Sequence, residues 1–144
     1  MKIYNKNYNE LTKDELYNIL RLRNQIFIVE QKCYYEDIDN LDKDSIHIFK
    51  KENDNIISYL RIFKEDGNYH MGRVLVKEEN RKNGLSRKLL KYAIEYIFNE
   101  LKEEKIIIEA QDYLKEFYKS MGFVEKSEVY LLDNIPHLIM ELNK

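Results

Sequence analysis

One stretch near the middle of the chain, residues 72–101, constrains the fold more than any other. It begins with a short apolar run at residues 74–76, bounded by Gly72 and by three charged residues, which is typical of a buried strand. A polar, basic loop follows. From Gly84 onward the apolar residues recur at helical spacing; they are Leu85, Leu89, Leu90, Ala93, Ile97 and Leu101. The predicted order is therefore strand, tight basic loop, helix.

The loop between this strand and this helix is a candidate anion site. Consecutive backbone N–H groups and a helix N-terminus converge in such a loop, which suits a pyrophosphate. Arg81, Lys82 and Arg87 add positive charge beside it. An ordinary strand-to-helix turn with a solvated basic rim fits the loop equally well, because a single glycine in a basic loop is a weak motif. The loop lacks the ending of a P-loop and the three glycines of a dinucleotide fingerprint.

Composition excludes several classes of protein. The 144 residues suffice for one domain, residues 1–144, with a real core. The formal net charge of −2 argues against a nucleic-acid binder. Cys33 is the sole cysteine and the three histidines are dispersed, so we expect no intramolecular disulfide and no metal site. No signal-peptide core or membrane-spanning apolar run is present, so we expect a cytoplasmic protein that does not bind membranes.

The remaining segments predict helices and a mixed sheet. Thr12 and Glu15 match a capping box, and the helix that they begin is expected to end near Glu30. Asp112 is expected to cap a shorter helix that Gly122 closes in a left-handed conformation. Alternation of apolar residues and turn signals predict the strands; these cover residues 3–5, 45–51, 56–64, 69–77, 105–110 (read as fully buried), 123–132 and 137–142. The expected fold class is α/β (α+β mixed), with about six to seven mostly antiparallel strands and helices on both faces.

Two segments together resemble the GNAT superfamily of acyl-CoA-dependent N-acyltransferases. Arg81-Lys82-Asn83-Gly84-Leu85-Ser86 is similar to its Gln/Arg-x-x-Gly-x-Gly/Ala signature, with Ser86 in place of the final Gly or Ala. Residues 117–123, Phe-Tyr-Lys-Ser-Met-Gly-Phe, resemble its Phe-Tyr-x-x-x-Gly-Phe segment. The resemblance implies the acyl-CoA N-acyltransferase fold and a site for acetyl-CoA.

The resemblance extends over nearly the whole chain to the ElaA-like group of that superfamily. The matching residues are Arg21, Arg23, residues 27–31, residues 33–37, Asp39, His47, residues 72–74, Ala110, Gln111 and residues 135–140. Asn134 stands where the group usually has glycine, and asparagine also tolerates a left-handed turn. This group implies an acetyl-CoA site and leaves the acceptor undefined.

The resemblance also implies which residues contact acetyl-CoA. In the family, the strand matching residues 74–76 splays from the strand matching residues 106–110, and pantetheine lies in the gap. A backbone N–H near Leu75 or Val76 would then polarise the thioester carbonyl. The implied cofactor-binding residues are Val74, Leu75, Val76, Arg81, Lys82, Asn83, Gly84, Leu85, Ser86, Gln111 and Tyr118.

Tyr118 and Glu109 are the candidate catalytic residues. An amine that attacks a thioester expels a thiolate, and a phenol with a pKa near ~10 can protonate it as a general acid. Tyr118 matches the family tyrosine for this role, although a helical tyrosine between Phe117 and Met121 is also typical of a core residue. Glu109, at the end of a strand, is placed to accept the proton of an ammonium substrate, directly or through water. The rivals for that role are Glu30, Glu36, His47 and His137.

The acceptor is expected to be a small-molecule amine or a lysine-type amine. Glu30, Gln31 and Glu36, with the acidic loop at residues 36–44, are expected to border its site, where carboxylates suit a cation. Arg73 either binds an acceptor carboxylate or pairs with Glu36. The sequence is compatible with a monomer or a homodimer.

Two functions other than acetyl transfer to an amine remain open on these grounds. A module that senses or sequesters acyl-CoA without transfer would keep the basic loop and have no need for Tyr118 or a base. A nucleic-acid-binding protein would use the basic helix start to hold phosphate, and its binding would weaken steeply with salt.

Overall fold

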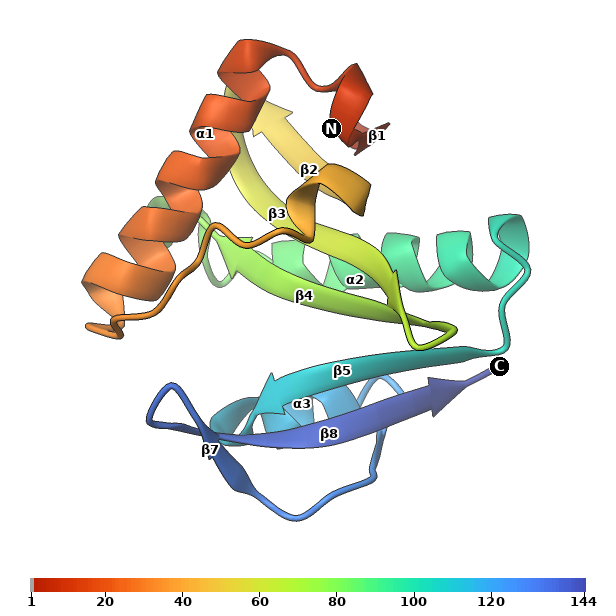
Figure 1. Ribbon diagram of the computed structural model, residues 1–144. Helices are drawn as coiled ribbons and strands as arrows, with labels where there is room; N and C mark the ends of the chain where they lie inside the picture. Colours follow the sequence, from red (N-terminus) through yellow and green to blue (C-terminus); the bar gives the residue numbers. More distant parts are fainter. Residues whose placement is uncertain (1) are drawn as a thin grey trace.

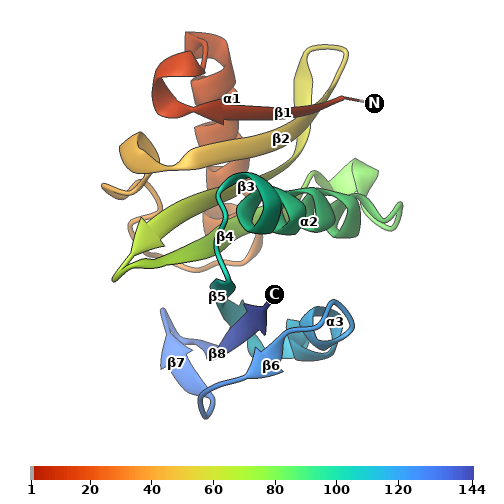
Figure 2. The ribbon, with the colours of Figure 1, turned by 90° about the vertical axis from the view of Figure 1, so that its right-hand side faces the viewer.

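The structure, a computed structural model, describes residues 2–144 as one mixed sheet with helices on both faces (Figures 1 and 2). The eight strands of this part of the chain are β1 (Ile3–Asn7), β2 (Ile46–Glu52), β3 (Asn55–Glu65), β4 (Asn68–Val76), β5 (Lys105–Gln111), β6 (Val124–Glu125), β7 (Tyr130–Leu132) and β8 (Ile135–Asn143). Their order in the sheet is β1-β2-β3-β4-β5-β8-β6, and β7 also pairs with β8. All neighbours are antiparallel except β4 and β5. The predicted mixed, mostly antiparallel sheet is confirmed.

In the described part of the chain, three α-helices cover the sheet. The first, α1 (Lys13–Arg23), begins at Thr12, whose side chain accepts a hydrogen bond from the Glu15 backbone N–H as the capping box predicts. It continues through wider π-helical turns (Asn24–Glu30) and lies on one face. On the opposite face lie α2 (Leu85–Glu95), extended by π-helical turns (Tyr96–Glu100), and α3 (Lys115–Lys119), as Figure 2 shows.

Each face of the sheet has its own core. Against α1, the buried cluster is made of Ile19, Leu22, Ile26, Phe27, Phe49, Ile56, Tyr59 and Leu75. A larger cluster joins α2 and α3 to the other face, and includes Ile48, Leu60, Ile62, Leu89, Leu90, Ile106, Leu138 and Met140. Strands β2 and β3 therefore have apolar side chains on both faces, as expected for the centre of a sheet between two helical layers.

Three sequence expectations are corrected by the structure. Strand β5 is not fully buried: Ile106, Ile108 and Ala110 are buried, whereas Glu109 is exposed because its face of the strand borders a cavity. Asp112 makes no cap; a single 3₁₀ turn (Asp112–Leu114) precedes α3, and no side chain caps either segment. The segment 123–132 is not one strand, because β6 and β7 pair with different parts of β8 and four residues separate them.

Candidate active site

The sheet is split between β4 and β5. These two parallel strands pair only where Tyr69 faces Ile106 and His70 faces Ile107, and beyond that point they diverge (Figure 1). A register shift in the β3–β4 pair, where Tyr59 faces Leu75 but Arg61 faces Gly72, marks a bulge in β4. An extra residue in one strand bends it and increases its twist. The edge of β4 that faces β5 therefore has no strand partner over residues 71–76, as the family resemblance implied.

A pocket of about 420 Å³ opens from this split toward the start of α2. Its wall includes Val74, Leu75 and Val76 of β4 and, from the loop and α2, Arg81, Lys82, Gly84, Leu85 and Ser86. Gly84 lies at the N-cap of α2 with φ 70°, and no side chain caps the helix. The N–H groups of its first turn thus face the pocket end without a side-chain acceptor, which is the arrangement that binds an anion. We call this pocket the donor pocket, after the acyl donor that the family resemblance implies.

Two arginines beside the donor pocket are held in place. Arg81 donates from Nε to the Val76 carbonyl at 3.0 Å and pairs with Glu30 at 3.0 Å. Arg87 donates to the Ser120 hydroxyl at 2.9 Å, and its guanidinium lies 5.0 Å from the centre of the Phe117 ring. Glu30, expected near the acceptor, therefore lies on the donor side of the split. Asn83 does not line the pocket, and its amide donates to the Asn80 carbonyl.

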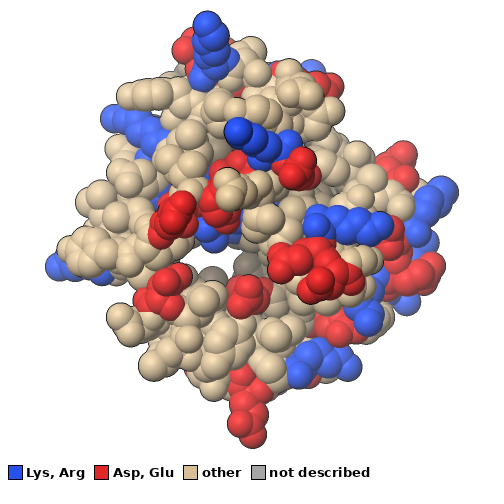
Figure 3. Space-filling view, viewed as in Figure 1, with Lys and Arg blue, Asp and Glu red and all other residues tan. Residues whose placement is uncertain are grey.

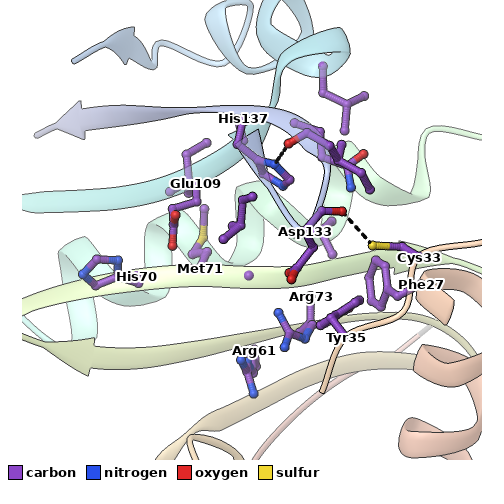
Figure 4. Close-up of a pocket in the computed structure, with 18 of the residues that line it drawn as sticks. Phe27, Cys33, Tyr35, Arg61, His70, Met71, Arg73, Glu109, Asp133 and His137 are labelled. Atoms are coloured by element: carbon purple, nitrogen blue, oxygen red, sulfur yellow. Dashed lines mark hydrogen bonds between the residues drawn. The ribbon is translucent and has the colours of Figure 1, made fainter. Parts of the chain in front are cut away.

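A second pocket, of about 310 Å³, opens on the face of the sheet that carries α1 (Figures 3 and 4). Residues of β4 and β5 form its walls, and the β7–β8 turn and the segment after α1 border it. Figure 3 shows a hollow at this place with acidic side chains around it. We call it the acceptor pocket, after the amine acceptor that the family resemblance implies. The two pockets share six lining residues, and so they meet inside the split; these are Phe27, Gln31, Val74, Tyr113, Leu114 and Tyr118.

Tyr118 stands at the junction of the two pockets. Its side chain is 6% exposed, and Phe117 and Phe123 contact the ring edge to face. Burial raises the pKa of Tyr118 to about 12, with a smaller contribution from Tyr113. Within residues 2–144 the hydroxyl has no hydrogen-bond partner, so it is free for a ligand. Tyr118 is therefore both a core residue and a lining residue, and the two interpretations of the sequence are not exclusive.

Glu109 lies on the wall of the acceptor pocket, and its carboxylate accepts a hydrogen bond from the Tyr130 hydroxyl at 2.6 Å. Burial and this carboxylate together raise the pKa of Tyr130, so the phenol stays protonated. His137 lies on the neighbouring strand β8, with its ring stacked on Tyr130, and lines the same pocket. Its Nδ1 lies 2.7 Å from the Ile135 carbonyl, which can only accept, so Nδ1 carries the proton.

His47 and Glu36, named as rivals of Glu109, are not in either pocket. His47 is fully buried; its Nε2 lies 2.9 Å from the Asp42 carbonyl and its Nδ1 lies 2.7 Å from the Tyr59 hydroxyl. Burial lowers its pKa, so the ring is neutral with both nitrogens occupied. His47 is a structural residue. Glu36 is exposed on the loop after α1.

Arg73, on the bulge of β4 with φ 50°, does not pair with Glu36. It belongs to a ring of six ion pairs in which each arginine contacts two aspartates and each aspartate contacts two arginines. In order around the ring, the members are Arg23, Asp37, Arg73, Asp39, Arg61 and Asp42. Burial alone would raise the pKa of Asp39, but hydrogen bonds and charge from Arg61 hold that pKa below its usual value. The ring fixes the acidic loop against the sheet and forms one side of the acceptor pocket.

Two weak contacts join the halves of the split sheet at its open end. The Cys33 thiol donates to the Asp133 carbonyl at 3.1 Å, and the Gln111 amide donates to the Gln31 side chain at 3.4 Å. Gln31 and Gln111, both predicted site residues, thus lie together at the pocket mouth. Four lining residues were not predicted as site residues; they are Phe27, Cys33, Tyr113 and Asp133. Phe27 and Cys33 belong to segments that carry the family resemblance, but the place of all four at the site depends on long-range packing.

The matched family model is described as an acetyltransferase (GNAT) domain and covers residues 10–144. The chain belongs to the GNAT family. Within it, the chain resembles the ElaA-like proteins: it is 37% identical over 138 residues to Protein ElaA of Escherichia coli, covering 92% of this chain and 90% of that protein. It is also 38% identical over 140 residues to a UPF0039 protein of Schizosaccharomyces pombe, covering 95% and 93%.

Solved structures of GNAT proteins share the fold. The crystal structure of E. coli ElaA matches with a TM-score of 0.94 at 34% identity, covering 99% of this chain and 100% of that one. An acyl-CoA N-acyltransferase from Pseudomonas aeruginosa matches with a TM-score of 0.93 at 34% identity, covering 98% of both chains. The predicted GNAT fold is confirmed, and family membership supports an acyl-CoA-dependent acyltransferase. Among residues 2–144, no group of His, Cys, Asp or Glu side chains is arranged to hold a metal, and no helix could span a membrane.

Proposed function

We propose that this GNAT protein transfers the acetyl group of acetyl-CoA to a primary amine by direct attack in a ternary complex. The observation that carries the proposal is the meeting of two pockets at Tyr118 and Val74, inside the split between β4 and β5. A donor that enters from the start of α2 and an acceptor that enters from the α1 face would then meet without leaving the site. Holding two reactants in this way removes much of the entropic barrier of a bimolecular reaction.

Three features of the donor pocket support the binding of acetyl-CoA. The uncapped N-terminus of α2 and the basic loop suit the pyrophosphate. The free edge of β4 offers backbone groups to pantetheine, and a backbone N–H near Leu75 or Val76 would polarise the thioester carbonyl. Where the two pockets meet, Phe27, Val74 and Leu114 contribute apolar side chains, which would suit an acyl group such as acetyl.

In the proposed reaction, Glu109 accepts a proton and Tyr118 donates one. Glu109 takes a proton from the ammonium substrate, directly or through water, and the free amine attacks the thioester carbonyl carbon. A C–N bond forms, the C–S bond breaks, and the departing thiolate receives the phenol proton of Tyr118. The second proton of the attacking nitrogen passes to solvent, from which Tyr118 is reprotonated. The products are an N-acetyl amine and free CoA.

Release of free CoA from acetyl-CoA, followed with a thiol reagent, tests this function. The panel of acceptors is amines, polyamines, amino acids and lysine peptides. Release that depends on an acceptor is the expected result, and it names the class of substrate. Binding of acetyl-CoA by calorimetry without release for any acceptor would instead favour the acyl-CoA sensor.

A further inference from the structure

The positive charges of the acceptor pocket are already neutralised. Arg61 and Arg73 are the two arginines of its wall, and each contacts two aspartates of the ion-pair ring. The ring contains three arginines and three aspartates, so its net charge is zero. An arginine that already contacts two carboxylates gains little from a third, because like charges in one site repel. The wall therefore offers poor binding for the carboxylate of an acceptor.

Three other carboxylates of the pocket have no ionic partner within residues 2–144; they are Glu65, Glu109 and Asp133. In Figure 4, Glu109 and Asp133 point into the pocket from β5 and from the β7–β8 turn. Glu65 lies at the end of β3, on the rim. These residues give the pocket a surplus of negative charge, which matches the acidic side chains around the hollow in Figure 3.

His137 lines the same part of the acceptor pocket. Its side chain is 8% exposed and its ring lies on the pocket wall between Glu109 and Asp133 (Figure 4). Because Nδ1 donates to the Ile135 carbonyl, Nε2 is the nitrogen that carries the lone pair when the ring is neutral, and no residue of the described chain donates to it. Nε2 is accessible from the pocket, so a ligand or water can donate to it. The pocket thus presents hydrogen-bond acceptors on this wall, from three different segments.

We propose that the acceptor is an amine that carries a second cationic group and no carboxylate, a diamine or polyamine in chemical class. This inference rests on the proposed function, and it specifies the substrate. The reacting amine lies at the junction with the donor pocket, and the second cation lies beside Asp133 and Nε2 of His137. Glu65, toward the other end of the pocket, adds to the negative charge of its rim. An amino acid is a poor substrate because its carboxylate meets this negative wall with no free cation to bind it.

Three acceptors of similar length test the proposal in the acetyl-CoA assay: diaminobutane with an amine at each end, n-butylamine, and γ-aminobutyrate. A hydrogen-bonded charge pair contributes about tenfold or more in affinity, so kcat/KM for the diamine should exceed that for n-butylamine by about tenfold or more. γ-Aminobutyrate should be slower than n-butylamine. Equal rates for all three, or the highest rate for γ-aminobutyrate, would overturn the proposal and leave the proposed acetyl transfer intact.

Substitutions locate the second cation. The double variant Glu65→Gln, Asp133→Asn removes two carboxylates, and asparagine tolerates the left-handed backbone of position 133 (φ 52°). The advantage of the diamine should fall to about twofold or less, because the charge pairs are lost, with KM for acetyl-CoA unchanged. Glu104→Gln, an exposed carboxylate outside the pocket, is the control and should keep the full advantage. An unchanged advantage in the double variant would contradict the assignment.

A failure of the reaction itself is separable from a failure of this inference. If no amine releases CoA, the proposed function is wrong. Calorimetric titration of diaminobutane then tests binding to the pocket independently of the reaction. Binding that the double variant loses supports a cationic ligand in this pocket, and absence of binding to the unsubstituted protein overturns it.

Discussion

At the scale of single residues, burial controls the chemistry of Tyr118. Its pKa is raised to about 12 because the ring is desolvated between Phe117 and Phe123, so the phenol is fully protonated at neutral pH. Within residues 2–144 this hydroxyl has no hydrogen-bond partner, and it lies at the junction of both pockets, as the proposed acid role requires. Glu109 differs: it is exposed and already accepts a hydrogen bond, so solvent reaches it.

Replacement of Tyr118 by phenylalanine keeps the ring and removes the proton donor. General acid catalysis contributes about a hundredfold or more, so kcat should fall by that factor in Tyr118→Phe, while the Kd of acetyl-CoA stays the same. Steady-state kinetics and calorimetry measure the two quantities. Tyr96→Phe, on the half-buried side of the π-helical turns after α2, is the matched control. An unchanged kcat would remove the acid role of Tyr118.

Glu15 makes the stability of the protein depend on pH. It is 3% exposed, pairs with Lys6 at 3.0 Å and Lys51 at 2.7 Å, and accepts from the Thr12 N–H. Burial alone would raise its pKa, but these partners lower it from 4.5 to about 2. Because the folded pKa lies below the unfolded one, the stabilisation is present above pH 4.5 and is lost as the pH falls toward 2.

Glu15→Gln should therefore lower the free energy of unfolding at neutral pH by on the order of 2 kcal/mol. The difference from the unsubstituted protein should shrink below pH 4.5 and vanish near pH 2. Urea titrations at several pH values measure it. Glu10→Gln serves as the control, because Glu10 also accepts from a capping N–H but is exposed and has no lysine partner. A pH-independent difference would show that the ion pairs are not the cause.

The residues of the ion-pair ring show why part of the site could not be read from the sequence. Asp37, Asp39 and Asp42 lie in a segment without periodicity, so nothing local indicates that they face inward. Their partner Arg23 occupies a helix end, where a charged residue is normally solvated. Arg61 occupies a central strand, and nothing in its local sequence shows which carboxylates reach it. The sequence also could not decide between the alternatives for Arg73. The fold shows that Arg73 pairs with Asp37 and not with Glu36.

At the scale of elements, α2 and its loop were predictable because local rules act together there. Helical spacing of apolar residues gave the helix, and the need for φ above zero gave the glycine at its start. Strand β5 and the segment before β8 were less predictable. Burial of one face of β5 depends on the split beside it, and the break between β6 and β7 depends on which part of β8 each one meets.

Gly84→Val tests the start of α2 as the pyrophosphate site. A β-branched residue at φ 70° is strained by roughly 1–2 kcal/mol. No protein atom lies within 4 Å of the added Cβ, so the side chain occupies space beside the donor pocket. Binding of acetyl-CoA, measured by calorimetry, should be lost. Gly67→Val, at φ 80° in the β3–β4 turn and equally open, should lose similar stability and bind acetyl-CoA normally. Normal binding to Gly84→Val would show that the pyrophosphate lies elsewhere.

At the scale of the whole molecule, function follows from one departure from regular structure. A continuous sheet would have buried β4 and β5 against each other, and the two pockets would not meet. The bulge of β4 opens the sheet, the ion-pair ring holds the acidic loop along one side of the opening, and α2 directs its N-terminus to the other. The sequence alone indicated the split only through family resemblance, because strand divergence leaves no local pattern. The acidic acceptor pocket appears only in the fold.

The measurement that most directly tests direct transfer in a ternary complex is a matrix of initial rates, with acetyl-CoA and diaminobutane both varied. Direct attack requires both substrates on the enzyme at once, so double-reciprocal plots should intersect, and acetyl-CoA alone should release no burst of CoA. Parallel lines together with a burst of CoA in the absence of amine would show a covalent acetyl-enzyme. That result would contradict a site in which donor and acceptor meet across the split between β4 and β5.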